Sequence, residues 1–288
     1  MHYDLAILDL DGVVYIGPKA VPHAIAALNT LGASGTRLMA ATNNANRAAS
    51  VVAEHLQLLG LNIAPEDVMT SAQAAASFLA RALGPNAPVL AVGGDGVAAS
   101  LRAEGLEVLR SNADLEIASN VAHMARAVVT GYGPLTAWFD IACAHWAIVG
   151  GARWIATNVD PSVPTPYGFA PGNGAFVGLL ERSTGVAPEV MGKPKPTLFL
   201  EAIERAQAAR TLVIGDRLDT DIDGANAACV DSILVFTGVN DTLDLAQQPM
   251  HAWPTYAARD LRSLTGEVVL VRHEGDRFTA DSTDPVVM

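Results

Sequence analysis

Short apolar runs alternate with helical periodicities along most of the chain. The apolar runs predict buried strands at residues 5–8, 37–41, 89–92, 126–131, 153–157, 211–214 and 233–236. Between them, apolar residues at helical spacing predict helices at residues 23–33, 48–59, 97–104, 135–147 and 196–208. Strands that alternate with helices are typical of an α/β fold, and we expect a Rossmann-like doubly wound parallel sheet.

A shift in composition indicates a domain boundary near residues 84–88, which read Gly-Pro-Asn-Ala-Pro. These residues are unfavourable to both helix and strand. The strands and helices expected after this point suggest a compact α/β module. Proline and glycine recur between residues 163 and 172, and we interpret this stretch as a long loop of the kind that often carries function. Residues 266–288 are mostly polar, and the pattern predicts no role for them.

Charge and composition exclude several classes of function. The chain has 288 residues and a formal net charge of -12, so its general field would repel nucleic acids and anionic membrane surfaces. No apolar run reaches the length of a membrane span. The seven histidines are scattered, without the spacing that is typical of zinc sites. We therefore expect neither a nucleic-acid partner, nor a membrane protein, nor a zinc enzyme.

The N-terminal residues and the cysteines favour a cytoplasmic location. The chain enters its first strand within a few residues, without the basic and apolar regions of a leader peptide. The two cysteines, Cys143 and Cys229, lie far apart in Ala-rich stretches that are expected to be helical. We interpret both as buried free thiols in a reducing compartment.

Two aspartates follow the first predicted strand and are the first candidates for chemistry. Residues two apart on a strand share a face, so Asp9 and Asp11 point the same way. Paired carboxylates repel each other, and such a pair usually binds a cation, shares a proton or divides acid and nucleophile roles. A solvated Asp-Gly turn explains this stretch equally well when it is taken alone.

Polar side chains also follow other predicted strands. Thr42, Asn43 and Asn44 form a strand-to-helix turn, and Asp216 follows the strand at 211–214. Hydroxyl, amide and backbone N–H donors at such a turn suit a phosphate, although ordinary helix capping explains the same residues. In open parallel sheets, ligands bind at the carboxyl ends of the strands, so we expect these residues to meet the paired aspartates. The lone Lys193 is a further candidate for this crevice.

Four motifs together resemble those of the haloacid dehalogenase-like superfamily of aspartate-nucleophile phosphatases. They are Asp9-Leu10-Asp11-Gly12-Val13, Thr42-Asn43-Asn44, Gly192-Lys193-Pro194 and Gly215-Asp216-Arg217-Leu218-Asp219-Thr220-Asp221-Ile222. Their order and spacing match the superfamily across residues 3–265. The chain is more narrowly similar to the branch of NagD-type, phosphoglycolate, pyridoxal-phosphate and glycerol-phosphate phosphatases. Because that branch inserts an α/β cap between the second and third motifs, the resemblance implies a cap at 85–187 and a discontinuous core at 1–84 and 188–265.

The resemblance implies a role for each motif residue. Asp9 would be the nucleophile, and Asp11 would be the acid that protonates the leaving alcohol and then the base that activates water. Mg²⁺ would be held by Asp9, the backbone carbonyl of Asp11 and Asp216, with Asp221 supporting its waters. The groups that would bind the transferring phosphoryl oxygens are Thr42, Asn43, Asn44 and Lys193.

The cap supplies substrate specificity in this branch. The resemblance therefore makes Tyr132, Asn158, Asp160 and the 163–172 loop candidates to contact the leaving group. Pyridoxal-phosphate phosphatases of this type carry a histidine where this chain has Val163, which counts against that substrate. The resemblance also implies a homodimer formed through the cap.

We therefore expect a Mg²⁺-dependent phosphatase for a small organic phosphate, with glycerol 3-phosphate or phosphoglycolate as the first choices. Nucleoside monophosphates, sugar phosphates and pyridoxal phosphate are alternative substrates. A phosphomutase usually has its cap between the first two motifs, where this chain has only a short flap and one helix, and a dehalogenase has no need of an acid at Asp11. A catalytically silent metabolite-binding protein is the alternative that is not an enzyme.

Overall fold

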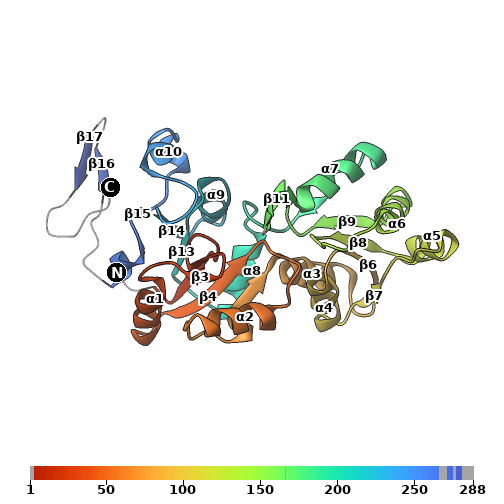
Figure 1. Ribbon diagram of the computed structural model, residues 1–288, viewed down its shortest axis with the longest axis horizontal. Helices are drawn as coiled ribbons and strands as arrows, with labels where there is room; N and C mark the ends of the chain where they lie inside the picture. The colour runs from red at the N-terminus through yellow and green to blue at the C-terminus, as the bar shows by residue number, and fades with distance from the viewer. Residues whose placement is uncertain (1–2, 166, 266–270, 275–276, 281–288) are drawn as a thin grey trace. The chain divides into compact units, whose positions relative to one another are not determined.

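The computed structural model describes residues 3–165, 167–265, 271–274 and 277–280 (Figure 1). The chain forms two compact units, unit 1 with Met1–Ala41, Val52–Met69 and Lys193–Met288, and unit 2 with Thr42–Val51 and Thr70–Gly192. Each unit is built on a parallel sheet with helices, which confirms the expected α/β fold class. Unit 2 extends beyond the segment 85–187 that the resemblance implies for the cap. One reason is that helix α3 (Ser71–Leu83) packs against α4 (Asp95–Ala103) of the same unit.

The sheet of unit 1 places the first motif in its centre. Its spatial order is β15-β14-β13-β1-β4-β5, and the strands from β15 to β4 run parallel. All of β1 is buried, and its last residue, Leu8, lies between Ala40 and Ile214. Asp9 therefore emerges at the middle of the carboxyl edge. The strands are β1 (Leu5–Leu8), β4 (Arg37–Thr42), β5 (Val68–Thr70), β13 (Thr211–Gly215), β14 (Asp231–Val235) and β15 (Tyr256–Ala258).

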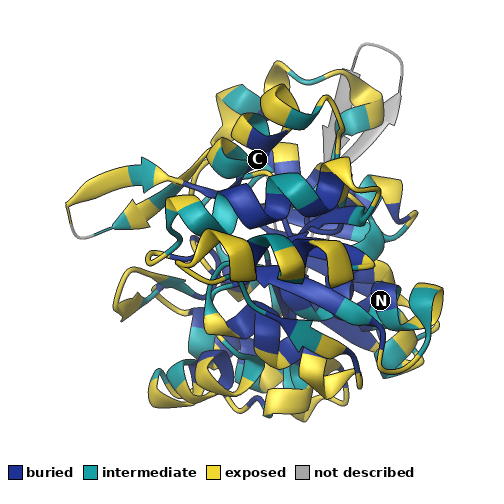
Figure 2. Cartoon of the chain, turned by 90° about the vertical axis from the view of Figure 1, so that its right-hand side faces the viewer, coloured by how far each residue is buried: buried dark blue, intermediate teal, exposed yellow. Residues whose placement is uncertain are grey.

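The helices beside this sheet bury one face and expose the other, and Figure 2 shows the same two-sided burial for helices along the chain. In α8, Leu198, Phe199 and Ala202 are buried, because residues one turn apart lie on the same side of a helix. No helix among the described residues is long and apolar enough to cross a membrane. The helices and turns are α1 (Ala24–Ala33), α2 (Ala49–Leu58), α8 (Thr197–Ala206), α9 (Asp223–Ala227), α10 (Thr242–Ala246), Pro65–Asp67, Leu218–Ile222, Met250–Ala252 and Leu261–Leu264.

Three small hairpins account for the strands among the described residues that lie outside the two larger sheets. The expected flap after Asp11 is confirmed as the antiparallel pair β2 (Tyr15–Ile16) and β3 (Lys19–Ala20). Within the C-terminal extension, β16 (Val271–Glu274) pairs antiparallel with β17 (Arg277–Ala280). The third hairpin belongs to unit 2.

Unit 2 contains a second parallel sheet with the order β12-β9-β8-β6-β7. Trp154 of β9 and Cys143 of α6 belong to its apolar core, and α6 packs against both α5 and α7. The strands are β6 (Pro88–Val92), β7 (Glu107–Leu109), β8 (Ala127–Thr130), β9 (Arg153–Ala156) and β12 (Glu189–Val190). The helices besides α3 and α4 are α5 (Leu115–Met124), α6 (Trp138–Val149) and α7 (Asn173–Thr184).

The stretch expected as a loop at 163–172 is instead mostly a hairpin. Strand β10 (Ser162–Thr165) pairs antiparallel with β11 (Gly168–Pro171), and the Thr165 hydroxyl donates a 2.6 Å hydrogen bond to the carbonyl of Gly168. The prolines concealed these strands, because proline lacks the N–H that most strand positions use. In a two-stranded sheet each strand has an outer edge, where a missing N–H breaks no ladder bond.

Two further expectations are wrong. No strand was predicted after 233–236, but β15 follows it, pairs with β14 and is only three residues long. Cys143 is buried in α6 as expected, but Cys229 is exposed and follows α9 with a φ of 56°. Both thiols are free.

Candidate active site

Three carboxylates of unit 1 lie close together at the carboxyl edge of its sheet. Asp9 follows β1, Asp216 follows β13, and Asp221 lies in the turn Leu218–Ile222. One oxygen atom from each of them lies within 4.8 Å of the other two. Asp216 and Asp221 are each only 1% exposed, whereas the side chain of Asp9 is 16% exposed. The cluster is therefore almost dry, and Asp9 is its most accessible member.

Lys193 is buried among these acids. Its ammonium group donates to Asp9 Oδ1, to Asp221 Oδ1 at 2.7 Å and to the carbonyl of Ala41 at 3.2 Å. Because an ammonium group carries three hydrogens, these acceptors can engage all of them. Lys193 thus lies where the sequence predicted, and its single positive charge forms ion pairs with two of the three carboxylates.

Burial dominates the protonation of the cluster. Burial raises the pKa of Asp216 to about 6, and the charge of Asp221 adds to the rise. Burial also raises the pKa of Asp221 to about 6 and the pKa of Asp9 above its ordinary value, although Lys193 opposes both shifts. For Lys193 burial acts to lower the pKa, but Asp221 and Asp9 outweigh it and the pKa is raised. One cation is not enough to stabilise three buried carboxylates in their ionised forms.

The surroundings of Asp216 show where a second cation fits. Its Oδ1 atom is one of the few buried side-chain atoms of the described residues without a hydrogen-bond partner. Its Oδ2 atom accepts a 2.7 Å bond from the backbone N–H of Val239. A Cβ atom at Gly12 or at Gly238 would overlap Oδ2, and Gly12 also has a φ of 86° that favours glycine. The two glycines therefore let the backbone approach the carboxylate closely.

This donor set fits a hard divalent cation. Buried polar atoms normally have partners, so the orphaned Oδ1 of Asp216 beside two further carboxylates calls for a positive ligand. Carboxylate oxygens with room for water are what Mg²⁺ prefers. Asp11 is exposed, and its carboxylate is not part of the three-acid group found among the described residues.

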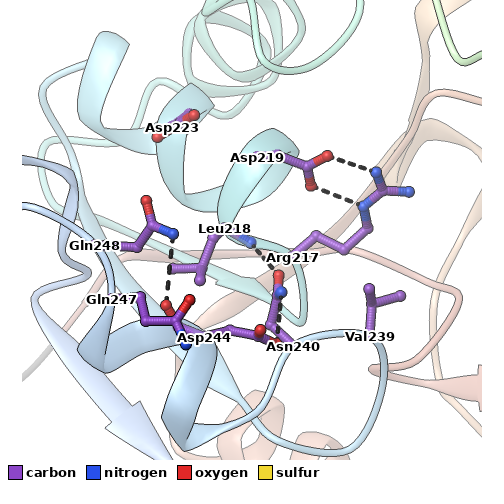
Figure 3. Close-up of a pocket in the computed structure, with 9 residues that line it drawn as sticks. All are labelled: Arg217, Leu218, Asp219, Asp223, Val239, Asn240, Asp244, Gln247 and Gln248. Carbon is purple, nitrogen blue, oxygen red and sulfur yellow. Dashed lines mark hydrogen bonds and ion pairs between the residues drawn. The ribbon is translucent and has the colours of Figure 1, made fainter.

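A polar pocket of about 330 Å³ lies beside the loop that carries Asp216 and Asp221, and residues that line it hold this loop (Figure 3). Arg217 and Asp219 form a two-bond ion pair at its rim, with distances of 2.7 and 3.0 Å. Asn240 accepts a 2.8 Å bond from the N–H of Leu218, and the N–H of Arg217 donates to Asp221 Oδ2 at 3.2 Å. The pocket residues thus hold the acid-bearing loop in place. Sequence patterns did not reveal Asn240 or Val239, because Val239 acts through its backbone N–H and a single asparagine gives no pattern.

The turn after β4 belongs largely to unit 2. Thr42 is buried, and its hydroxyl oxygen accepts a 3.1 Å bond from the N–H of Asn44, which leaves the hydroxyl hydrogen to donate. The side-chain oxygen of Asn44 accepts a 2.9 Å bond from the N–H of Asn46. Local side-chain bonds therefore shape this turn, as is common for threonine and asparagine.

The structure brings together Asn43, which the sequence assigned to phosphoryl binding, and Asn158 and Asp160, which it assigned to the leaving group. Asn43 donates to both carboxylate oxygens of Asp160 at 3.3 Å, and Asn158 donates to the carbonyl of Asn43 at 2.7 Å. Tyr132 is half-buried after β8, and its carbonyl accepts a 3.1 Å bond from the N–H of Gly94. These contacts lie within unit 2.

Comparison with known proteins agrees with this architecture. The model of haloacid dehalogenase-like hydrolases matches residues 6–107, and a HAD-hydrolase-like model matches residues 190–264. A D-glycerol 3-phosphate phosphatase of Mycobacterium tuberculosis is 44% identical over 263 residues, which cover 91% of this chain and 71% of that protein. An acid sugar phosphatase of Staphylococcus aureus is 32% identical over 269 residues, covering 93% and 98% of the two chains.

Solved structures give the same result. The crystal structure of the glycerol phosphate phosphatase Rv1692 from Mycobacterium tuberculosis in complex with magnesium has a TM-score of 0.84 and 41% identity. The match covers 97% of this chain and 85% of that one. Motifs, fold and relatives agree: this chain belongs to the haloacid dehalogenase-like hydrolase superfamily, in its branch of NagD-type phosphatases.

Proposed function

We propose that this phosphoric monoester hydrolase acts on glycerol 3-phosphate and forms an aspartyl-phosphate at Asp9. The observation that supports it best is the partly exposed Asp9 beside the orphaned oxygen of Asp216, a nucleophile next to a cation position. The choice of glycerol 3-phosphate rests on the 44% identical relative. Phosphoglycolate is the second candidate, as the sequence resemblance suggests.

Mg²⁺ is the cofactor, and Asp9, Asp216 and the carbonyl of Asp11 would hold it, with Asp221 supporting its waters. When bound, it supplies positive charge to the phosphoryl oxygens and to the acid cluster. Lys193 already bridges Asp9 and Asp221, so the nucleophile is fixed before substrate arrives. Local cationic charge resolves the conflict between an anionic substrate and a chain of net charge -12.

In the first half-reaction an oxygen of Asp9 attacks phosphorus, and the bond from phosphorus to the leaving alcohol breaks. Asp11 gives its proton to that alcohol. In the second half-reaction Asp11 takes a proton from water, which attacks the aspartyl-phosphate and releases inorganic phosphate and the Asp9 carboxylate. The exposure of Asp11 suits a group that must exchange a proton in each cycle. Thr42 and the turn that follows it would bind the phosphoryl oxygens.

Two alternatives to a phosphatase are a phosphomutase and a catalytically silent binding protein. The interval between Asp11 and Thr42 contains only the β2–β3 hairpin, α1 and the core strand β4, which argues against the usual cap of a phosphomutase. A silent binding protein has no need of a nucleophile held by a buried lysine. Free phosphate released from glycerol 3-phosphate, without an isomerised sugar phosphate from sugar substrates, distinguishes a phosphatase from both.

The test is phosphate release with Mg²⁺ from glycerol 3-phosphate, phosphoglycolate, nucleoside monophosphates, sugar phosphates and pyridoxal phosphate. We expect glycerol 3-phosphate to have the highest kcat/KM. Borohydride should reduce the acyl phosphate during turnover and leave homoserine at position 9, which peptide mass spectrometry detects. A different preferred ester would overturn the substrate, and turnover without a trapped acyl phosphate would overturn the intermediate.

A further inference from the structure

Asn43 is held by unit 2 from several sides. Its carbonyl accepts two hydrogen bonds of 2.7 Å, one from the amide of Asn158 and one from the hydroxyl of Ser71. Its side-chain amide donates to both oxygens of Asp160. A Cβ atom at Gly192 would lie 2.6 Å from Asn43 Oδ1, so the backbone at Gly192 closes against the same side chain. Both the peptide and the side chain of Asn43 are therefore fixed.

The side-chain amide of Asn158 is engaged at both its nitrogen and its oxygen. Its Nδ2 atom donates to Asn43, and its Oδ1 atom accepts a 3.2 Å bond from the N–H of Asp160. It is only 3% exposed, and its own carbonyl accepts a 2.7 Å bond from the buried Asn173. An amide that is buried and engaged at both ends is a structural brace and not a contact for an incoming ligand.

We infer that Asn158 and Asp160 are positioning residues, which act through Asn43 to set the phosphoryl-binding turn and do not select the leaving group. This inference rests on the proposed phosphatase function. The sequence resemblance placed both residues at the leaving group, whereas their hydrogen bonds lead to the turn Thr42-Asn43-Asn44. A turn that is held before binding places its donors without further loss of conformational freedom, and a misplaced donor weakens transition-state binding.

The two roles predict different patterns across substrates. All phosphate monoesters share the phosphoryl group, so loss of a positioning residue should lower kcat/KM by the same factor for every ester. Loss of a leaving-group contact should affect only the ester that makes it. Asp160→Ala and Asn158→Ala are therefore assayed with glycerol 3-phosphate, phosphoglycolate and p-nitrophenyl phosphate, and with inorganic phosphate alone as a competitive inhibitor.

We expect both variants to lose roughly ten- to a hundredfold in kcat/KM with all three esters, and inorganic phosphate to inhibit more weakly. Asp160→Asn, which keeps an acceptor for the amide of Asn43, should recover most of the activity. Asp95→Ala and Asn120→Ala, exposed residues of the same unit, are matched controls that should behave as wild type. Thermal unfolding followed by circular dichroism verifies that each variant is folded.

Each outcome decides the question. A loss confined to one ester, with unchanged inhibition by phosphate, overturns the positioning role and restores the leaving-group contact. Activity within about twofold of wild type for folded Asp160→Ala and Asn158→Ala also overturns it. A wild-type protein that neither turns over any ester nor binds inorganic phosphate defeats the proposed function itself, and the inference with it.

Discussion

Each of the two units has its own parallel sheet, and the two sheets differ in the residues that follow their strands. In unit 1 strands β1 and β13 are followed by Asp9 and Asp216, and Lys193 forms ion pairs with only two of the three clustered acids. In unit 2 strand β9 is followed by Thr157 and Asn158, and the side-chain amides of Asn158 and Asn173 donate to backbone carbonyls. The first arrangement is a cluster of like charges that lacks a positive charge, whereas the second consists of neutral groups, of which Thr157 Oγ1 and Asn173 Oδ1 have no hydrogen-bond partner among the described residues. The chemistry that needs a metal cofactor is thus concentrated at the strand ends of unit 1, where the protein's own groups do not neutralise the negative charge.

The largest effect should come from the nucleophile. We expect Asp9→Asn to lower kcat at least about a thousandfold, because the amide of asparagine cannot attack phosphorus to form the aspartyl-phosphate. The fold should remain intact, since burial already disfavours the charged form of Asp9. Phosphate release and thermal melting check both statements. Phosphate release at the wild-type rate from the purified variant would contradict the mechanism.

The next effect concerns the position of the missing cation. Asp216→Asn keeps an acceptor for the N–H of Val239 but removes a charged metal ligand. We expect activity to fall about a hundredfold or more at limiting Mg²⁺. Without metal, its melting temperature at pH 7.5 should equal or exceed that of wild type, because a buried charge is lost. Full activity at limiting Mg²⁺ would show that Asp216 is not a metal ligand. A much lower melting temperature would show that the buried charge of Asp216 does not destabilise the metal-free protein.

The third effect is a dependence on pH. In the metal-free protein the pKa values of Asp216 and Asp221 are raised to about 6, so both bind protons below that pH. Since Mg²⁺ must displace those protons, its dissociation constant should rise by roughly tenfold per pH unit and per proton between pH 6 and 5. Isothermal titration calorimetry at several pH values measures it. An affinity that is constant down to pH 5 would contradict the raised pKa values.

The same shift predicts how metal-free stability changes with pH. The folded-state pKa of each acid lies above its ordinary value of 3.8, so the native state binds more protons than the unfolded state between about pH 4 and 6. The contribution of these groups to stability is therefore unfavourable above pH 6 and is relieved as the pH falls through 6 towards 4. In Asp216→Asn this dependence should be smaller than in wild type, which denaturant titrations in EDTA test.

The smallest effect concerns the packing around Asn43 in unit 2. Gly192→Ala would place a Cβ atom 2.5 Å from the carbonyl oxygen of Thr157 and close to Asn43, which should cost about 1–3 kcal/mol of unfolding free energy. The matched control is Gly178→Ala inside α7, where a Cβ meets nothing within 4 Å. That change should stabilise the protein by up to about 1 kcal/mol. Urea unfolding compares the two, and equal effects would mean that the packing around Asn43 is loose.

The sequence was informative where a residue follows a buried strand. The run that forms β1 is apolar throughout because a central parallel strand is covered on both faces, and this placed Asp9 correctly. Asp216 was found for the same reason. The partners of Asp216 were missed, because Gly238 contributes only the lack of a side chain and Val239 only its N–H. Neither leaves a pattern in the sequence.

Contacts between distant segments were beyond the reach of sequence patterns. Asn43 and Asp160 are 117 positions apart, and no periodicity relates them. The amphipathic helix α3 was compatible with either neighbour, so its packing against α4 could not be foreseen from its own residues. The hairpin of β10 and β11 was concealed by prolines. In the first two cases the deciding partner lies far away in the sequence, whereas in the hairpin the partner is close by and the prolines concealed it.

The two cysteines make this protein well suited to site-specific labelling. Cys229 is exposed in unit 1, whereas Cys143 is buried in unit 2 and burial raises the pKa of its thiol to about 11. Because maleimides react with the thiolate, a fluorophore added at neutral pH should attach to Cys229 alone. A second cysteine introduced at Asn120 would then allow energy transfer to report the separation of the two units during turnover, without removal of any native residue but that one.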